Sequence, residues 1–278
     1  LEDDGRIEEK IYNEYMELGL RYPPTFTQVS TTEEAAQVLR STVIDLVICM
    51  PGNADNDAFD VARDIKGKFP NIHCVVLTPF SHGITKRMLN EDLSIFDYVF
   101  CWLGNTNLIL SIIKLIEDKM NLEHDIQEAG VQMILLVEDS IRFYSSILPN
   151  LYNYILEQSK NFSKEALNRH AATMRMRGRP KVVLARTYEE AKKLYDKYSN
   201  NTLGVISDAR FPLKSAARAF GNEVDEAVKP EYGTDTFGRE KCPDAGLQLF
   251  RYIRKHDSFV PLILESSESD NRAKAEAE

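Results

Sequence analysis

Short hydrophobic runs alternate with helical patterns along the second half of the chain. The run at 131–137 ends abruptly in Glu138 and Asp139, and such a continuous apolar run is typical of a strand buried on both faces of a parallel sheet. Further strands are predicted at 181–185, 203–207 and 259–264. Helical patterns lie between them at 142–180, 187–198 and 245–255. The order β-α-β-α-β-α-β predicts a doubly wound parallel sheet.

The first half repeats this order of elements. Strands are predicted at 26–29, 43–50, 73–78 and 98–101, and helices at 31–40, 58–68 and 105–119. The helices at 31–40 and 187–198 both begin with a capping box, the pattern Thr-x-x-Glu. The repeat predicts an α/β protein with two doubly wound parallel-sheet domains in tandem. Their limits are 1–122 and 131–278, and the polar stretch 121–130 is interpreted as a helical extension between them.

Both ends of the sequence interrupt the pattern. Residues 1–4 match only the tail of the segment that is seen whole at 136–140, and the sequence stops inside a predicted helix at Glu278. We therefore expect the second domain to be truncated at its C-terminal end, and the chain to be an N-terminal fragment of a larger protein.

Composition limits the class of protein. A chain of 278 residues with 43% hydrophobic and 28% charged residues can form two folded domains. No apolar run approaches the roughly 18 residues that a membrane span needs, and the start is too acidic for a secretory signal, so a cytoplasmic protein without membrane contact is expected. The net charge of -9 argues against nucleic-acid binding.

The four cysteines lack metal-ligand spacing. The basic run at 169–181 is interpreted as a solvated helix face and turn, with an anionic partner as the alternative.

Acidic and hydroxyl side chains follow three of the predicted strands of the second half. Glu138 and Asp139 follow the first strand, Asp208 the third and Ser266 the fourth. Ligands of open parallel sheets bind at the carboxyl ends of strands, so these side chains are expected to converge. Three carboxylates repel one another unless a cation neutralises them. Mg²⁺ suits them because it takes oxygen ligands and leaves room for a phosphate. The carboxylate of Asp208 could then attack phosphorus and form an acyl phosphate. The plainer alternatives are helix capping by Glu138 and Asp139 and a turn at Asp208.

These segments resemble the receiver domains of two-component response regulators. The matching segments are LVEDS (136–140), VISDAR (205–210), DAGL (244–247) and PLILESS (261–267). The resemblance implies a flavodoxin-like fold, Asp208 as phosphoacceptor, a Mg²⁺ site formed by Glu138, Asp139 and Asp208, and Ser266 as the switch residue that contacts the phosphoryl group. It also implies a histidine kinase or a small phosphodonor as partner, and a module that is not itself an enzyme.

The sequence departs from the receiver pattern at several points. The lysine that the family carries after its fifth strand would lie beyond Glu278, and a long insertion occupies 213–243, for which a lid or a partner-docking role is the hypothesis. In the first half, Glu2 and Asp3 align with the acidic pair and Met50 with the phosphoacceptor; Thr78 aligns with the switch position and Cys101 with the lysine. A thioether forms no stable phosphoenzyme, so the first domain is predicted to be a degenerate pseudo-receiver.

The whole chain also resembles the N-terminal region of bacterial phosphoenolpyruvate synthase-like proteins. The segments are LVEDSIRFY (136–144), MRMRGRPK (174–181) and LGVISDARFP (203–212). This resemblance implies a regulatory region fused to a downstream phosphotransferase domain of the same polypeptide. The alternatives are a Mg²⁺-dependent phosphohydrolase, with Asp208 as nucleophile, and a phosphorylation-independent scaffold of two pseudo-receivers. The oligomeric state, including a homodimer, stays open.

Overall fold

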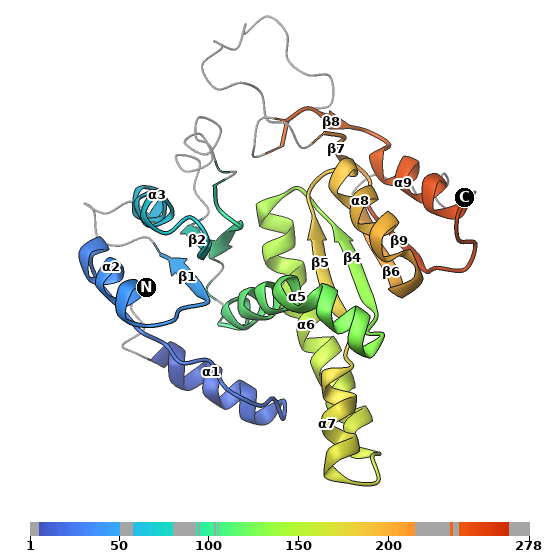
Figure 1. The fold of residues 1–278 in the computed structure, drawn as a ribbon. Helices are drawn as coiled ribbons and strands as arrows, with labels where there is room; N and C mark the ends of the chain where they lie inside the picture. The colour runs from blue at the N-terminus through green and yellow to red at the C-terminus, as the bar shows by residue number, and fades with distance from the viewer. Residues whose placement is uncertain are drawn as a thin grey trace, which may run out of the picture. The chain divides into compact units, whose positions relative to one another are not determined.

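The computed structural model describes residues 6–50, 58–79, 93, 95–102, 104, 106–214, 234–235 and 239–266. The chain divides into two compact units, drawn in Figure 1. One comprises Leu1–Lys86, Asp92–Ile116 and Ser145–Arg177, and the other Arg87–Glu91, Glu117–Tyr144 and Gly178–Glu278. The first unit therefore includes a segment that lies within the predicted second domain. The continuous limits 1–122 and 131–278 stay a prediction.

The second unit is built on a parallel sheet of four strands. The strands are β4 (Met133–Val137), β5 (Lys181–Ala185), β6 (Thr202–Asp208) and β9 (Leu262–Glu265). Their order is β5-β4-β6-β9, and all pairings are parallel. All four strands were predicted from the apolar runs, with limits that differ by up to three residues. The chain leaves β4 on one side to form β5 and returns on the other side as β6, so the strand order reverses between β4 and β6.

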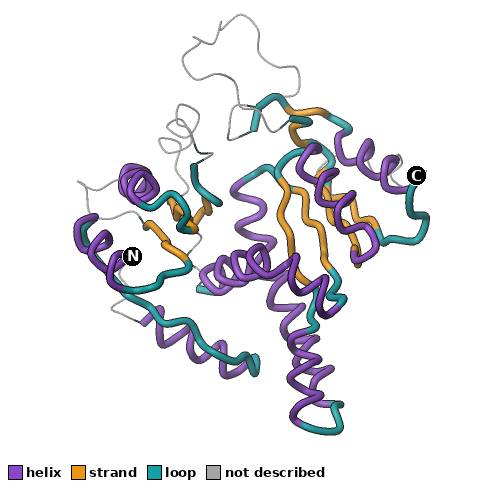
Figure 2. Tube along the Cα trace, viewed as in Figure 1, coloured by secondary structure: helices purple, strands orange, loops and turns teal. Residues whose placement is uncertain are grey.

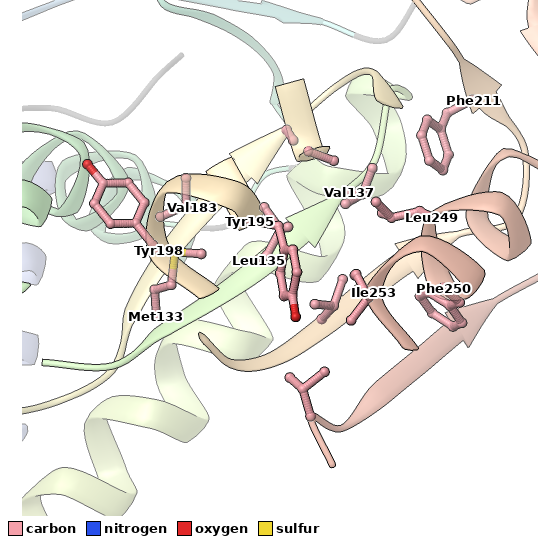
Figure 3. Packing of buried hydrophobic residues seen from close by; sticks show 14 of the residues in the cluster. Met133, Leu135, Val137, Val183, Tyr195, Tyr198, Phe211, Leu249, Phe250 and Ile253 are labelled. Carbon is pink, nitrogen blue, oxygen red and sulfur yellow. The ribbon is translucent and has the colours of Figure 1, made fainter. Parts of the chain in front are cut away.

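Helices α8 (Tyr188–Tyr198) and α9 (Ala245–Arg254) pack on this sheet. The apolar side chains of β4 alternate along the strand, so Met133, Leu135 and Val137 share one face. They lie in one buried cluster with Tyr195 of α8 and with Leu249 and Ile253 of α9 (Figure 3). This packing fixes the register of β4 because a slip by one residue would turn these side chains to the opposite face of the sheet and break up the cluster.

The first unit contains a smaller parallel sheet. Strands β1 (Leu46–Cys49), β2 (His73–Pro79) and β3 (Tyr98–Trp102) pair in the order β1-β2-β3. Among the described residues, the helices that lie wholly within this unit are α1 (Arg6–Glu17), α2 (Thr32–Ser41), α3 (Ala58–Lys68) and α7 (Arg169–Arg177). Figure 2 shows the helices and strands of both units by colour. The predicted helix at 58–68 and strands at 73–78 and 98–101 are confirmed.

The strand predicted at 26–29 is wrong. These residues are irregular, and Val29 is 38% exposed. Polar Thr27 and Gln28 lie between the two apolar side chains, so the run has too little apolar surface to pair with the sheet. An α/β class with parallel sheets is confirmed in both units. Two complete flavodoxin-like domains remain a proposal.

Both predicted capping boxes are present. The hydroxyl of Thr187 accepts a hydrogen bond from Glu190 N at 3.2 Å, and the Glu190 carboxylate accepts one from Arg186 N at 2.8 Å. At the start of α2, Thr31 and Glu34 make the equivalent bonds, with Glu34 N and Ser30 N as the donors. In each box one bond satisfies an N–H of the first helical turn, which has no partner within the helix, and the other satisfies an N–H just before the helix.

Two long helices complete the fold. Helix α5 (Asn107–Ala129) runs through the polar stretch 121–130, as the interpretation of a helical extension requires. Helix α6 (Ile141–Lys164) and α7 account for most of the long stretch after β4. A short 3₁₀ helix lies at Ser199–Asn201. None of the helices in the described ranges is both long enough and apolar enough to cross a membrane.

The basic run at 169–181 is only partly solvated. Arg179 and Lys181 are 7% and 8% exposed, contrary to the predicted solvated face and turn. The Arg179 guanidinium donates to both carboxylate oxygens of Asp118, at 3.0 and 2.6 Å, and Lys181 Nζ lies 2.6 Å from Asp125 Oδ2. These partners lie on α5, more than fifty residues earlier, and no local pattern indicates them.

Candidate functional site

The register of the sheet brings the predicted acidic residues together. Val137 of β4 is paired with Ser207 of β6. The next residues, Glu138 and Asp208, therefore lie at the same edge, where the strand order reverses and ligands of such sheets bind. One carboxylate oxygen from each of Glu138, Asp139 and Asp208 can be chosen so that all three lie within 4.8 Å of one another. Among the described residues this is the only such group of three.

Burial makes these carboxylates costly to ionise. Glu138 is 4% exposed and Asp139 is fully buried. Loss of solvent, with the nearby charge of Asp208, raises the pKa of Glu138 to about 8. Burial also raises the pKa of Asp139, to about 6, although Lys241 opposes the shift. The pKa of Asp208 is raised as well, mainly by burial, against the effect of Lys241 and of backbone N–H groups. A bound cation would relieve this electrostatic strain.

Hydrogen bonds orient two of the three carboxylates. Ser140 N donates to Glu138 Oε1 at 2.9 Å, and Ala209 N donates to Asp208 Oδ1 at 2.7 Å. These local bonds are those that a turn or a cap would make. Asp139 differs, because no described residue donates a hydrogen bond to its buried Oδ1. A buried oxygen of this kind is expected to have a partner, so a cap does not account for the whole cluster.

A lysine that sequence reasoning missed lies in the site. Lys241 Nζ is 2.7 Å from Asp139 Oδ2. Lys241 belongs to β8 (Lys241–Cys242), which pairs antiparallel with β7 (Phe211–Pro212) directly after β6. It lies at the end of the insertion 213–243, most of which is outside the described residues. Only a contact across about a hundred residues identifies it, so the sequence carried no local signal.

Helix α9 approaches the backbone of the predicted phosphoacceptor. Gly246 N donates to Ala209 O at 3.1 Å. A Cβ atom at Gly246 would lie only 2.4 Å from the Asp208 carbonyl oxygen and 2.8 Å from a methyl group of Leu264. The segment DAGL at the start of the helix therefore needs a glycine at its third position for a steric reason.

Ser266 follows β9 at the same edge of the sheet. Asp208 is the register partner of Glu265, and Ala209 N donates to Glu265 O at 3.0 Å. Ser266 is the next residue and is exposed. It lies one position beyond the register partner of Asp208, outside the group of three carboxylates, and Ser267 lies outside the described residues.

The aligned positions of the first unit lack such a cluster in the described part. Glu2 and Asp3 lie outside the described residues. Met50 follows β1 and is half-buried, whereas Thr78 in β2 and Cys101 in β3 are 3% and 2% exposed. That this unit is a degenerate copy stays a prediction.

The donor set fits a hard divalent cation. All three ligands are carboxylates, and Mg²⁺ takes oxygen ligands at about 2.1 Å, so two of its ligand atoms lie at most about 4.2 Å apart. The three carboxylate oxygens lie within 4.8 Å of one another, close to that limit. The unpartnered oxygen of Asp139 provides an unused ligand.

Comparison of the chain with family models, with curated proteins and with solved structures finds no match.

Proposed function

We propose that the second unit is a receiver-type module that accepts a phosphoryl group on Asp208 with Mg²⁺ as cofactor. The observation that carries the proposal is the convergence of Glu138, Asp139 and Asp208 at the point where the strand order reverses. The order β5-β4-β6-β9 also corresponds to strands 2-1-3-4 of a flavodoxin-like sheet.

The chain's own residues provide the nucleophile and its orientation. A carboxylate oxygen of Asp208 attacks phosphorus, the bond from phosphorus to the donor's leaving group breaks, and the leaving group departs with the electron pair. Ala209 N holds Asp208 Oδ1 and so fixes the carboxylate. When bound, Mg²⁺ would neutralise the phosphoryl oxygens as charge develops. Ligands from Glu138, Asp139 and Asp208 would hold it beside the nucleophile.

The added charge provides a route to signalling. A phosphoryl group adds about -1.5 to -2 charge and new hydrogen-bond acceptors. Ser266, on the adjacent strand edge, is the residue whose hydroxyl would turn toward the phosphoryl group.

The phosphodonor would be a histidine kinase or a small phosphorylated compound. The output would be a downstream domain of the same polypeptide, of the phosphoenolpyruvate synthase type.

The decisive test is phosphorylation of the 278-residue chain by acetyl phosphate with and without Mg²⁺. We expect one phosphoryl group per chain by intact-mass spectrometry, dependent on Mg²⁺ and absent in Asp208→Asn. Glu189→Gln, an exposed acidic residue on α8, is the matched control and should be phosphorylated normally. Phosphorylation of Asp208→Asn to the wild-type extent would refute the proposal.

The alternative functions give different outcomes. A phosphohydrolase would release many phosphates per chain from a phosphomonoester, whereas a receiver holds one acyl phosphate. The hydrolase is the weaker candidate because no second acid/base residue stands close to Asp208 in the sequence, and Glu138, which lies near it in the structure, is proposed as a metal ligand. A scaffold of two pseudo-receivers would bind neither Mg²⁺ nor beryllofluoride near Asp208.

A further inference from the structure

The carboxylate cluster contains a cation that comes from outside the main sheet. Lys241 Nζ lies 2.7 Å from Asp139 Oδ2, with the lysine side chain 20% exposed and the aspartate side chain fully buried. The charge of Lys241 also opposes the rise that burial causes in the pKa of Glu138 and of Asp208, so it reaches all three carboxylates. The lysine is therefore placed to interact with any group that binds among them.

The segment around Lys241 is anchored on both sides. On one side, Lys241 is the register partner of Pro212, and the neighbouring Phe211 is fully buried in the core of the unit. On the other side, Cys242 donates a hydrogen bond through Sγ to Asp244 Oδ1 at 3.2 Å, just before helix α9. Pairing with β7 on one side and the contacts before α9 on the other thus hold the lysine in place.

A buried ion pair joins Asp235 and Arg239, shortly before Lys241 in the chain. The Arg239 guanidinium contacts Asp235 Oδ2 through Nε at 2.7 Å and through Nη2 at 2.6 Å. Arg239 N donates to Asp235 Oδ1 at 2.7 Å, and Asp235 N donates to Arg239 O at 2.9 Å. An isolated antiparallel β-bridge joins the flanking residues Thr234 and Glu240. So many bonds over a few residues fix the direction in which the next residue enters the site.

We propose that Lys241 is the phosphoryl-contacting cation of the site, placed there by the pairing of β8 with β7. This inference rests on the proposed function. Before phosphorylation the ammonium neutralises Asp139. When Asp139 turns to the metal, the ammonium loses its partner, and the nearest new anion is a phosphoryl oxygen on Asp208. Lys241 would then donate a charge-assisted hydrogen bond to that oxygen, and strand β8 would respond to whether the site is occupied.

If the charge of Lys241 is removed, the proposal predicts that Mg²⁺ affinity and beryllofluoride affinity change in opposite directions. Lys241 competes with a metal ion for Asp139, so Lys241→Met should bind Mg²⁺ more tightly than the wild type. The same variant lacks the donor for the phosphoryl oxygen, so beryllofluoride binding should weaken by about tenfold or more, the effect of one hydrogen bond to a charged group. A purely structural lysine would weaken both kinds of binding together.

The experiment measures Mg²⁺ affinity by calorimetry, and beryllofluoride affinity at saturating Mg²⁺, for the wild type, Lys241→Met and Lys241→Arg. Lys241→Arg retains the charge and should recover much of the beryllofluoride affinity. Lys214→Met removes an exposed lysine after β7 and should change neither affinity. Weakening of both affinities in Lys241→Met, or no change in either, would overturn the role of Lys241.

A second measurement uses the wild type and therefore does not require that any variant folds. Amide hydrogen exchange at β8 of the wild type should become faster when Mg²⁺ is added, because the ion pair with Asp139 is broken. It should become slower again when beryllofluoride follows. Unchanged exchange in both steps would refute the coupling. If the wild type binds beryllofluoride through Asp208 but the predicted changes fail, only the Lys241 inference falls. If the wild type binds neither Mg²⁺ nor beryllofluoride, the proposed function falls with it.

Discussion

The carbonyl oxygen of Asp208 lies so close to Gly246 that a Cβ atom there would approach it to 2.4 Å. The start of helix α9 thus packs directly on the backbone that carries the proposed phosphoacceptor. Because the contact is with backbone, neither partner can yield by rotating a side chain. Position 246 therefore couples the packing of a helix to the position of the functional carboxylate.

Gly246→Ala should destabilise the chain by about 1–3 kcal/mol, the usual cost of inserting a methyl group into a well-packed site. It should also reduce phosphorylation, because Asp208 has to move. Urea denaturation and acetyl phosphate labelling measure the two effects. Gly67→Ala is the matched control: no atom lies within 4 Å of the added Cβ, and alanine inside α3 should stabilise it by about 0.5–1 kcal/mol. Equal effects of the two substitutions would contradict the steric interpretation.

The buried carboxylates predict how stability depends on pH when metal ions are removed with a chelator. The pKa of Glu138 rises from 4.5 to about 8 on folding, so between these values the folded chain holds a proton that the unfolded chain has released. Raising the pH through this range therefore favours unfolding. We expect the free energy of unfolding to fall by more than about 1 kcal/mol.

The variant Glu138→Gln separates the contribution of Glu138 to the pH dependence of stability from the contributions of the other titrating groups. It should be more stable than the wild type at pH 8 and should show a flatter pH profile, because it has no proton to lose there. Denaturant unfolding at several pH values with the chelator present measures both. An unchanged profile in Glu138→Gln would show that Glu138 does not titrate as its burial requires.

Addition of Mg²⁺ should stabilise the folded chain at neutral pH. A ligand present at about a hundred times its dissociation constant adds about 2.7 kcal/mol to the free energy of unfolding when it binds only the folded state. Asp139→Asn should abolish most of this gain, because the fully buried Asp139 offers the oxygen that lacks a described partner. Thermal unfolding with and without Mg²⁺ is the measurement. Glu189→Gln should respond like the wild type, and a full response of Asp139→Asn would exclude this site.

Asp118→Ala should be the most destabilising substitution outside the site. It leaves the Arg179 guanidinium, 7% exposed, without the carboxylate that accepts two of its hydrogen bonds. It also removes the acceptor for Val182 N at the start of β5. Breaking a buried pair in this way costs about 3–5 kcal/mol.

The control for Asp118→Ala is the substitution of Glu123, a residue of the same helix that forms an exposed ion pair with α8. Glu123 Oε2 lies 3.0 Å from Lys197 Nζ, with both side chains at least half exposed. Glu123→Ala should cost at most about 1 kcal/mol because water screens such pairs. Both variants are compared by urea denaturation, and similar losses in the two would show that Asp118 stabilises the unit no more than a surface residue does.

The sequence by itself determined the elements whose signals are local. The apolar run at 181–185, the helix at 58–68 and the capping boxes at Thr31 and Thr187 were all predicted correctly, because periodicity and capping depend on residues a few positions apart. The convergence of Glu138, Asp139 and Asp208 was also within reach of sequence reasoning, since the carboxyl ends of parallel strands share one edge.

Tertiary structure alone decided the features that depend on distant partners. Residues 26–29 fail to join a sheet because their apolar surface is too small for a neighbour to bury. Arg179 is buried because Asp118 of the distant helix α5, and not a neighbour in sequence, accepts its hydrogen bonds. Lys241 enters the acidic site because β8 pairs with β7, which brings it next to Asp139, about a hundred residues earlier in the chain. Each outcome depends on burial and charge contributed by remote segments, and residues next to one another in the sequence carry no record of them.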